Sequence, residues 1–476
     1  MDTARLDYFS YNDKSKTPNI NHFIKDTGAI AFENAITPAP WTIPSHVSLF
    51  TGKYPSEHGS IDYGFKIDKK KPFLPNLFSQ SGYFTVGITS NSLLTSSSDF
   101  DYGFDKYICT WNLFQDIKEH YRSMKTIKNK GLKGLFEVSG SIIKNKPVRN
   151  LANIIYRKWY SVQKNSTKSS IRTKDIAIDQ IVKSNKNGEN LFLFLNFMQP
   201  HMNYNPPAFA KEKFVSKDYN QPYQSPIEFY SGLYEDEKIK YFRELYQSEI
   251  FTLDQILGEI IDKISELNLM DDSAIILVSD HGEHIGDHSH ISHYFSVYNE
   301  LINVPLIVKF PNEFQKKISL NSSKDIVPTH SLFNTLLEFI EQKKYKTDVG
   351  SLFDNSKNFA ISELFMPSEY SYFIEECKRL SSGEFIVEDF ILNGFQNQQA
   401  IISNNLKYIV KEKGNNELYD FYADPNETNN LISSNRPDYN SFVDGVFPHV
   451  SIYDNAIKRG QMSEKLMRRM RSLGYY

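Results

Sequence analysis

Cysteine and long apolar runs are scarce in this 476-residue chain. Only Cys109 and Cys377 occur, so the sequence predicts no disulfide framework and is compatible with either redox compartment. No apolar run approaches the roughly 20 residues that a membrane-spanning helix needs, and the first residues do not resemble a signal peptide. The formal net charge is only −3. We expect a globular protein with one large domain and a smaller one.

The stretch between Ala39 and Gly59 has an order of residues that ordinary helix periodicity does not produce. Thr42 is followed by Pro44 and His46, and the segment closes at Gly52. A proline at the start and a glycine at the end predict a helix that begins near Pro44. A hydroxyl at the N-terminus of this helix would lie beside backbone N–H groups that bind anions.

This stretch resembles the nucleophile motif of the sulfatase family, within the alkaline-phosphatase superfamily. Thr42 stands where the family has a cysteine or serine, and His46 stands where it has an arginine. The family oxidises its cysteine or serine to formylglycine, and threonine is not a substrate for that conversion. The resemblance therefore implies that Thr42 acts directly, as an alkoxide nucleophile activated by a metal ion, as in relatives that transfer phosphoryl-type groups.

A second motif lies far downstream. The apolar run Ala274–Ser279 predicts a buried strand that ends directly in Asp280 and His281. An aspartate oxygen and an imidazole nitrogen are common metal ligands, and the resemblance implies that these two residues bind the family's metal ion. With Asp2 and Thr42 they would hold one divalent cation. A histidine ligand favours Mn²⁺ or Zn²⁺, while the carboxylates would also accept Ca²⁺ or Mg²⁺.

Asp2 opens an Asp-Thr-x-Arg-x-Asp segment, which in the family follows the first buried parallel strand. Asp2 would then lie at the carboxyl end of a strand, where open α/β sheets place their ligand-binding residues. The resemblance implies that Met1 is the last residue of that strand. The chain as written predicts a cytoplasmic protein, with an upstream signal or anchor as the alternative.

Two further histidines are candidates for contacts with the transferred group. His201 follows the apolar run Leu191–Phe197, within a Pro-His-x-x-Tyr-x-Pro-Pro segment that is typical of sulfatase relatives. His293 occupies the position at which the family has a lysine or histidine. The resemblance implies that both bind the transferred group, and His293 could also protonate the leaving oxygen because an imidazole titrates near neutral pH. The catalytic candidates are therefore Thr42, His46, His201 and His293.

Other polar residues are given structural roles. Asn91 follows the predicted strand Gly82–Thr89 and is expected to be a turn residue. Asp254 lies in the long helical pattern of Glu237–Leu267. Because Gly258 rather than a histidine stands four residues later, we expect a structural carboxylate and one principal metal ion. Three more histidines are expected in a flexible loop: His284, His288 and His290.

Apolar runs of strand length that precede these motifs predict an α/β fold, in which a mostly parallel central sheet is flanked by helices. By resemblance the fold is alkaline-phosphatase-like, with a catalytic domain at residues 1–345 and a smaller C-terminal α+β subdomain at residues 346–476. The subdomain prediction depends on short strands at residues 399–402 and 406–411 and on the segment that begins at Glu417.

Residues 118–174 differ from the rest of the chain in charge. They contain 15 Lys and Arg against Glu119 and Glu137, a net charge of +13. Apolar residues at loosely helical spacing predict a basic helical insertion. It is either a solvated helical face or a surface for an anionic glycan, a lipid headgroup at a membrane, or polyphosphate. Nucleic acid is not expected, because no binding motif accompanies the charge.

The sequence therefore predicts a metal-dependent, sulfatase-like hydrolase of sulfate or phosphate esters. It would act through a covalent Thr42 intermediate on a glycan or envelope-related substrate. Two alternatives stay open: a phosphoryl or phosphoethanolamine-type transferase of the same superfamily, and a non-catalytic sulfatase-like protein that binds anionic polymer. The sequence does not indicate an oligomeric state.

Overall fold

The computed structural model of the chain describes residues 1–9, 11, 15–112, 166–217, 219, 226–230, 235–293, 295–315, 324–342, 345–353, 358–367, 395–434 and 437–446. The predicted basic insertion at residues 118–174 lies outside the described residues, except for its last part, where helix α8 (Ser166–Asn187) begins. Among the described residues, no helix is both long enough and apolar enough to span a membrane.

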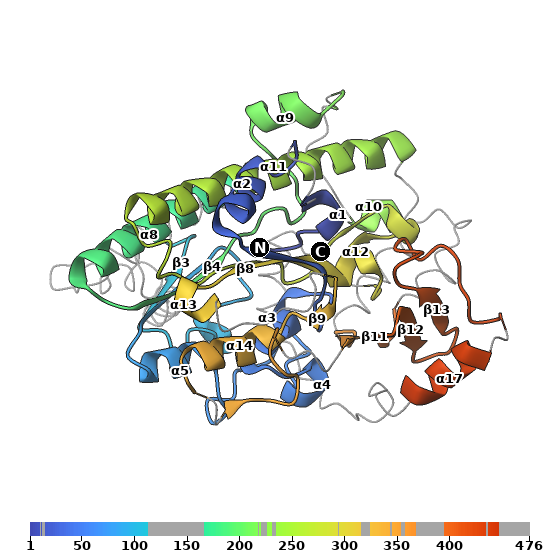
Figure 1. Cartoon of the computed structure of the whole chain (residues 1–476). Helices are drawn as coiled ribbons and strands as arrows, with labels where there is room; N and C mark the ends of the chain where they lie inside the picture. Colours follow the sequence, from blue (N-terminus) through green and yellow to red (C-terminus); the bar gives the residue numbers. More distant parts are fainter. Residues whose placement is uncertain are drawn as a thin grey trace, which may run out of the picture.

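Two sheets form the middle layer of the molecule (Figure 1). The first has the strand order β3-β2-β4, and its neighbours are parallel. The second has the order β5-β8-β1-β9; β8 runs antiparallel to both β5 and β1, whereas β1 and β9 are parallel. The predicted α/β class with parallel strands is therefore confirmed, with β8 as an antiparallel member. The strands are β1 (Ile30–Ile36), β2 (Phe84–Thr89), β3 (Lys106–Cys109), β4 (Leu191–Asn196), β5 (Ile275–Val278), β8 (Asn303–Lys309) and β9 (Ile326–Pro328).

Met1 and Asp2 join the carboxyl ends of β4 and β5. The Met1 amine donates to the Val278 carbonyl at 2.9 Å, and Asp280 N donates to the Met1 carbonyl at 3.1 Å. On the other side, Asp2 N donates to the Phe197 carbonyl at 2.9 Å. These bonds place the Asp2 carboxylate at the edge of the sheet layer where both strands end.

Helices cover the strand layer on two sides (Figure 1). On one side α8 packs against β2 and β4, and the long amphipathic helix α11 (Asp236–Glu266) packs against α8, α2 (Pro18–Thr27) and α9 (Ala208–Phe214). Asp254 on α11 accepts hydrogen bonds from Asn19 N at 3.1 Å and Ile20 N at 2.9 Å, at the N-terminus of α2. The predicted structural role of Asp254 is therefore confirmed.

On the other side of the strands lie α3 (Thr42–Thr51), α5 (Leu74–Gln80) and α14 (Ser331–Phe339). Helix α3 begins at Thr42, two residues before the predicted start, and it ends at Gly52, whose φ is +65°. A Cβ at Gly52 would lie 2.6 Å from the Phe333 ring of α14. Glycine is therefore required there both for the left-handed turn and for the close approach of the two helices.

The C-terminal part of the described chain forms an antiparallel sheet of four strands, in the order β10-β11-β12-β13. These strands confirm the short strands expected after residue 398, while the division at residue 345 stays a prediction. The sheet consists of β10 (Phe359–Leu364), β11 (Gln398–Ser403), β12 (Leu406–Lys411) and β13 (Glu417–Asp420), followed by α17 (Pro437–Val446).

The remaining described elements are short. They are α1 (Leu6–Phe9), α4 (Pro55–His58), α10 (Pro226–Tyr230), α12 (Asn299–Ile302), α13 (Asn312–Gln315), β6 (His284–Ile285), β7 (Ile291–Ser292) and the 3-10 turns η1 (Ser96–Ser98) and η3 (Asp287–Ser289).

Candidate active site

The first turn of α3 brings Thr42 to the end of β5. The Thr42 hydroxyl lies 3.3 Å from Nε2 of His281, and both side chains are buried. Two hydroxyls hold the neighbouring strand end in place: Ser45 Oγ and Thr37 Oγ1 both donate to the Asp280 carbonyl, at 2.6 and 2.5 Å. The two motifs, far apart in the sequence, therefore meet at one point, as predicted.

His281 presents one ring nitrogen to the site and uses the other to anchor itself. Its Nδ1 lies 2.9 Å from the Gly282 carbonyl, which can only accept, so Nδ1 carries the proton and Nε2 keeps its lone pair. This is the arrangement that orients a metal-binding imidazole. Gly282 itself must lack a side chain, because a Cβ there would lie 1.8 Å from the Glu300 carbonyl oxygen.

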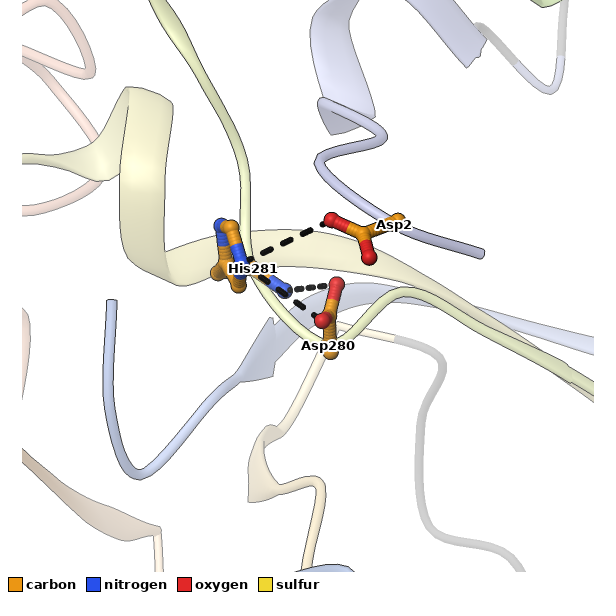
Figure 2. Close-up of side chains that lie close together, drawn as sticks. All are labelled: Asp2, Asp280 and His281. Atoms are coloured by element: carbon orange, nitrogen blue, oxygen red, sulfur yellow. Dashed lines mark hydrogen bonds and ion pairs between the residues drawn. The ribbon is translucent and has the colours of Figure 1, made fainter. Parts of the chain in front are cut away.

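Asp2 and Asp280 turn their carboxylates toward His281, as Figure 2 shows. His281 Nε2 lies 3.5 Å from Asp280 Oδ2 and 3.9 Å from Asp2 Oδ1. These two oxygens are buried and have no hydrogen-bond partner among the described residues, although such partners are normally found for buried polar atoms. Two carboxylate oxygens and one imidazole nitrogen with an available lone pair fit the ligand set of a divalent cation.

The electrostatics of this group support the same conclusion. Burial, and then the charge of Asp280, raises the pKa of Asp2 to about 6, and burial raises the pKa of Asp280 to about 6. Burial, and then His293, lowers the pKa of His281 to about 3. Two buried carboxylates side by side disfavour ionisation of one another, whereas a cation between them would favour the ionised state of both.

His46 lies between the first turn of α3 and Asp280, whose Oδ2 is 3.5 Å from the His46 Nδ1. Its Nδ1 lies 2.8 Å from the Thr42 carbonyl, and its ring packs edge-on against Phe100 and Phe194, with centroids 6.0 and 5.9 Å away. Burial lowers the pKa of His46 to about 3, so the ring is neutral and Nδ1–H donates to the carbonyl. His46 thus fixes the backbone of Thr42 in the first turn of α3.

His293 lies beside His281, and His201 lies beside His293. The ring centroid of His293 is 4.5 Å from that of His281 and 5.0 Å from that of His201. The Nδ1 of His293 lies 2.7 Å from Oε1 of Glu283, and both side chains are buried. Glu283 also accepts a hydrogen bond from Met202 N at 3.1 Å, so this one carboxylate ties His293 to the segment that carries His201.

Sequence reasoning missed two residues of the site. Asn91, expected to be only a turn residue, is buried and donates from Nδ2 to Asp2 Oδ2 at 2.6 Å. Its position just after β2 indicates that it lies near Asp2, because the carboxyl ends of parallel strands meet at one edge of the sheet. Glu283 was not singled out, since its contact with His293 depends on how the chain folds back between the two residues.

The prediction of a flexible histidine-rich loop is wrong for the described residues. His284 and Ile285 form β6, which pairs with Ile291 and Ser292 in β7, and both strands are buried, whereas the turn between them is partly exposed. His284 Nε2 lies 2.7 Å from Ser296 Oγ. Tyr230 of α10 binds the second strand: its hydroxyl donates to the Ile291 carbonyl and accepts from Ile291 N, both at 3.0 Å.

The chain is similar to known proteins over most of its length. The family profile described as Sulfatase matches residues 1–342. An arylsulfatase from Clostridium perfringens is 21% identical over 449 residues, which cover 89% of this chain and 86% of that protein. Among solved structures, the phosphonate monoester hydrolase of Agrobacterium radiobacter matches with a TM-score of 0.64 at 17% identity, covering 94% of this chain and 93% of that one. A protein solved in complex with its substrate D-glucosamine-2-N,6-O-disulfate matches with a TM-score of 0.60 at 15% identity, covering 97% and 98%.

The fold and the family profile agree on the assignment that the two motifs predicted. The profile spans both the Thr42 segment and the Asp280–His281 segment, and the solved structures share the arrangement of sheets and helices along nearly the whole chain. The chain therefore belongs to the sulfatase family and is an ester hydrolase of the sulfatase type.

Proposed function

We propose that this chain hydrolyses sulfate or phosphate esters through a covalent ester on Thr42, with one divalent cation held by Asp2, Asp280 and His281. The observation that carries the proposal is the convergence of two buried carboxylate oxygens without hydrogen-bond partners among the described residues and the Nε2 of His281, which contacts the Thr42 hydroxyl. The imidazole ligand favours Mn²⁺ or Zn²⁺ over Ca²⁺ or Mg²⁺. When bound, the cation would supply charge that stabilises a deprotonated hydroxyl and a developing oxyanion.

In the first step the Thr42 hydroxyl loses its proton to solvent, and its oxygen attacks the sulfur or phosphorus atom of the ester. The bond between that atom and the ester oxygen breaks, and the group is transferred to Thr42. The position of Thr42 at the start of α3 supports this role, because the N-terminus of a helix stabilises negative charge. His46 keeps this first turn in place by its bond to the Thr42 carbonyl.

The leaving alcohol needs a proton, and His293 is the candidate donor in its doubly protonated form, which the negative charge of Glu283 would stabilise. The contact between its Nδ1 and Glu283 fixes the ring orientation and leaves Nε2 to act on the substrate. His201 lies on the other side of His293 and would bind an oxygen of the transferred group. Water then attacks the same sulfur or phosphorus atom, the bond to the Thr42 oxygen breaks, and sulfate or phosphate is released.

The substrate class is proposed from the relatives together with Thr42. The relatives are described as an arylsulfatase, a phosphonate monoester hydrolase and a protein bound to a sulfated glucosamine. These names support a sulfate, phosphate or phosphonate ester on a glycan or an envelope component. Because threonine cannot become formylglycine, Thr42 favours the phosphate and phosphonate side of this range.

The test is a substrate panel of aryl sulfates, aryl phosphates, phosphodiesters and phosphonate monoesters. The full chain is treated with a chelator and then supplied in turn with Mn²⁺, Zn²⁺, Ca²⁺ or Mg²⁺. Thr42→Ala should lose at least about 10⁴-fold in kcat, while Thr42→Ser, which keeps a hydroxyl, should retain measurable activity. Acid quenching followed by mass spectrometry should find the covalent ester on Thr42. Full activity in Thr42→Ala would reject the nucleophile.

A further inference from the structure

A second group of ligand-type side chains lies in a part of the molecule that the proposed reaction does not use. It consists of His288 in η3, Glu300 in α12 and Glu427 in the loop after β13, and one ligand atom of each lies within 4.8 Å of the others. None of them belongs to the Thr42 site. They come from three segments: η3 and α12 are close to each other in the sequence, and the loop after β13 lies far downstream.

The charges in this group do not balance. Glu427 is buried, the Glu300 side chain is 9% exposed, and the buried cation beside them is Lys407. Lys407 Nζ lies 2.6 Å from Glu427 Oε1 and 2.9 Å from the side-chain oxygen of Asn299. One ammonium group beside two carboxylates leaves one negative charge. An uncompensated buried carboxylate is costly, so a further positive charge is expected, either from a proton on His288, whose pKa is raised because the effect of burial is outweighed by that of Glu300, or from a bound ion.

The geometry favours an ion. Glu300 Oε2 is buried and has no hydrogen-bond partner among the residues that the structure describes. His288 Nε2 lies 3.6 Å away from it, which is too long for a hydrogen bond. Two ligands at about 2.0–2.2 Å from one tetrahedral zinc ion lie about 3.4 Å apart. The gap between the two atoms therefore suits two ligands of one cation better than a donor and its acceptor.

Glu427, the third ligand, also has lone pairs available for the ion. Glu427 Oε2 accepts a hydrogen bond from Asn299 N at 2.6 Å, and Oε1 contacts Lys407. Each carboxylate oxygen carries two lone pairs, so one remains on each atom. Glu427 can therefore contribute to a cation without giving up either contact.

The backbone and a neighbouring aromatic ring hold the His288 side chain toward Glu300. His288 and Ser289 both have left-handed φ values, +49° and +57°, which cost energy in residues other than glycine. The His288 ring stacks on Tyr298, with centroids 3.9 Å apart and planes at 11°. Its side chain is 17% exposed, which leaves a path for an ion and a water ligand.

We propose that His288, Glu300 and Glu427 bind a second divalent cation, of the Zn²⁺ or Mn²⁺ type. The ion would fasten the β6–β7 hairpin and α12 to the loop after β13. Its role would be structural, because Glu300 lies in α12, immediately before β8, and its carbonyl packs against Gly282, next to His281. Binding there would stiffen the support of the Thr42 site without contact with the substrate.

The test counts zinc ions bound by the full chain after chelator treatment, by isothermal titration with ZnCl₂ and by metal analysis after gel filtration. The parent chain should bind two ions. Asp280→Asn should keep only the ion proposed here, and His288→Gln should keep only the other. Glu300→Gln serves as the second variant in case His288→Gln fails to fold, as checked by circular dichroism. His22→Gln is the matched control, because His22 is an exposed histidine.

Each outcome decides the proposal. Loss of one ion in His288→Gln and in Glu300→Gln, with no loss in His22→Gln, supports the site. If the parent chain binds one ion that Asp280→Asn removes, a proton rather than a metal balances Glu300 and the proposal is wrong. If the parent binds one ion that only His288→Gln removes, the second site is supported and the Thr42-site cation is rejected. The same zinc addition should raise the melting temperature of Asp280→Asn but not that of the double variant Asp280→Asn/His288→Gln.

Discussion

Glu283→Gln separates proton donation by His293 from a purely structural role. In the folded chain Glu283 Oε1 lies 2.7 Å from His293 Nδ1, and burial raises the pKa of Glu283 and lowers the pKa of His293. A glutamine has the same shape and its amide oxygen can still accept from Nδ1–H. The substitution therefore keeps the ring orientation and removes the negative charge behind it, although it also puts an amide group in place of the oxygen that accepts from Met202 N.

The expected decrease in kcat follows from the loss of that charge. A hydrogen bond to a charged group contributes about 1.5–3 kcal/mol, against about 1 kcal/mol for a neutral pair. The difference of about 0.5–2 kcal/mol corresponds to roughly a 2- to 30-fold loss of kcat. The loss should appear only where proton donation limits the rate. It should be large for esters of poor leaving groups, such as alkyl alcohols, and close to zero for 4-nitrophenyl esters, whose leaving group needs no proton.

The assay is therefore a leaving-group series measured on the parent chain and on Glu283→Gln under metal saturation. Asp254→Asn is the matched control, because Asp254 is another buried carboxylate that accepts hydrogen bonds, in this case at the start of α2. The control should lower the free energy of unfolding without any dependence on the leaving group. An equal loss on every ester in Glu283→Gln, or no loss at all, would refute the reasoning.

Three further predictions concern Asn91, His58 and Gly282. Asn91→Ala removes the hydrogen bond to Asp2 Oδ2 and should weaken binding of the activating ion roughly 10- to 100-fold, measured by metal titration; unchanged affinity would contradict the proposed role of Asp2. Burial lowers the pKa of His58 to about 3, so the folded state binds fewer protons than the unfolded state below about pH 6.5. The contribution of His58 to stability is therefore complete above about pH 6.5 and declines toward pH 3, by up to about 1.4 kcal/mol per pH unit; urea unfolding of His58→Gln should show a shallower pH dependence than the parent chain, and an equal slope would be inconsistent with a neutral, half-buried ring. Gly282→Ala places a Cβ against the Glu300 carbonyl and should destabilise the fold by at least about 1–3 kcal/mol while lowering activity; a normal urea midpoint would argue against the close contact.

Much of the site was predictable from order along the chain. Apolar runs of strand length end directly before His201 and Asp280, and the segment from Thr42 to Gly52 carries the signals of a helix start and a helix end. Because strands of one parallel sheet end at a common edge, residues that follow such runs are expected to meet there. Local patterns carry this information, and the structure confirms where Asp280, His281 and Thr42 lie.

Other features were decided only by tertiary contacts. The sequence does not show that Asn91 turns its amide toward Asp2, that Glu283 reaches His293, or that His46 bonds to the Thr42 backbone. The direction of a side chain depends on its rotamer and on neighbours that arrive from distant segments, and a local pattern contains neither. For the same reason the histidine-rich segment, polar in sequence and expected to be flexible, forms a hairpin of two buried strands, the second of which bonds to Tyr230. The sequence alone determined the family and the fold class, whereas packing between segments far apart in the chain decided which atoms face one another.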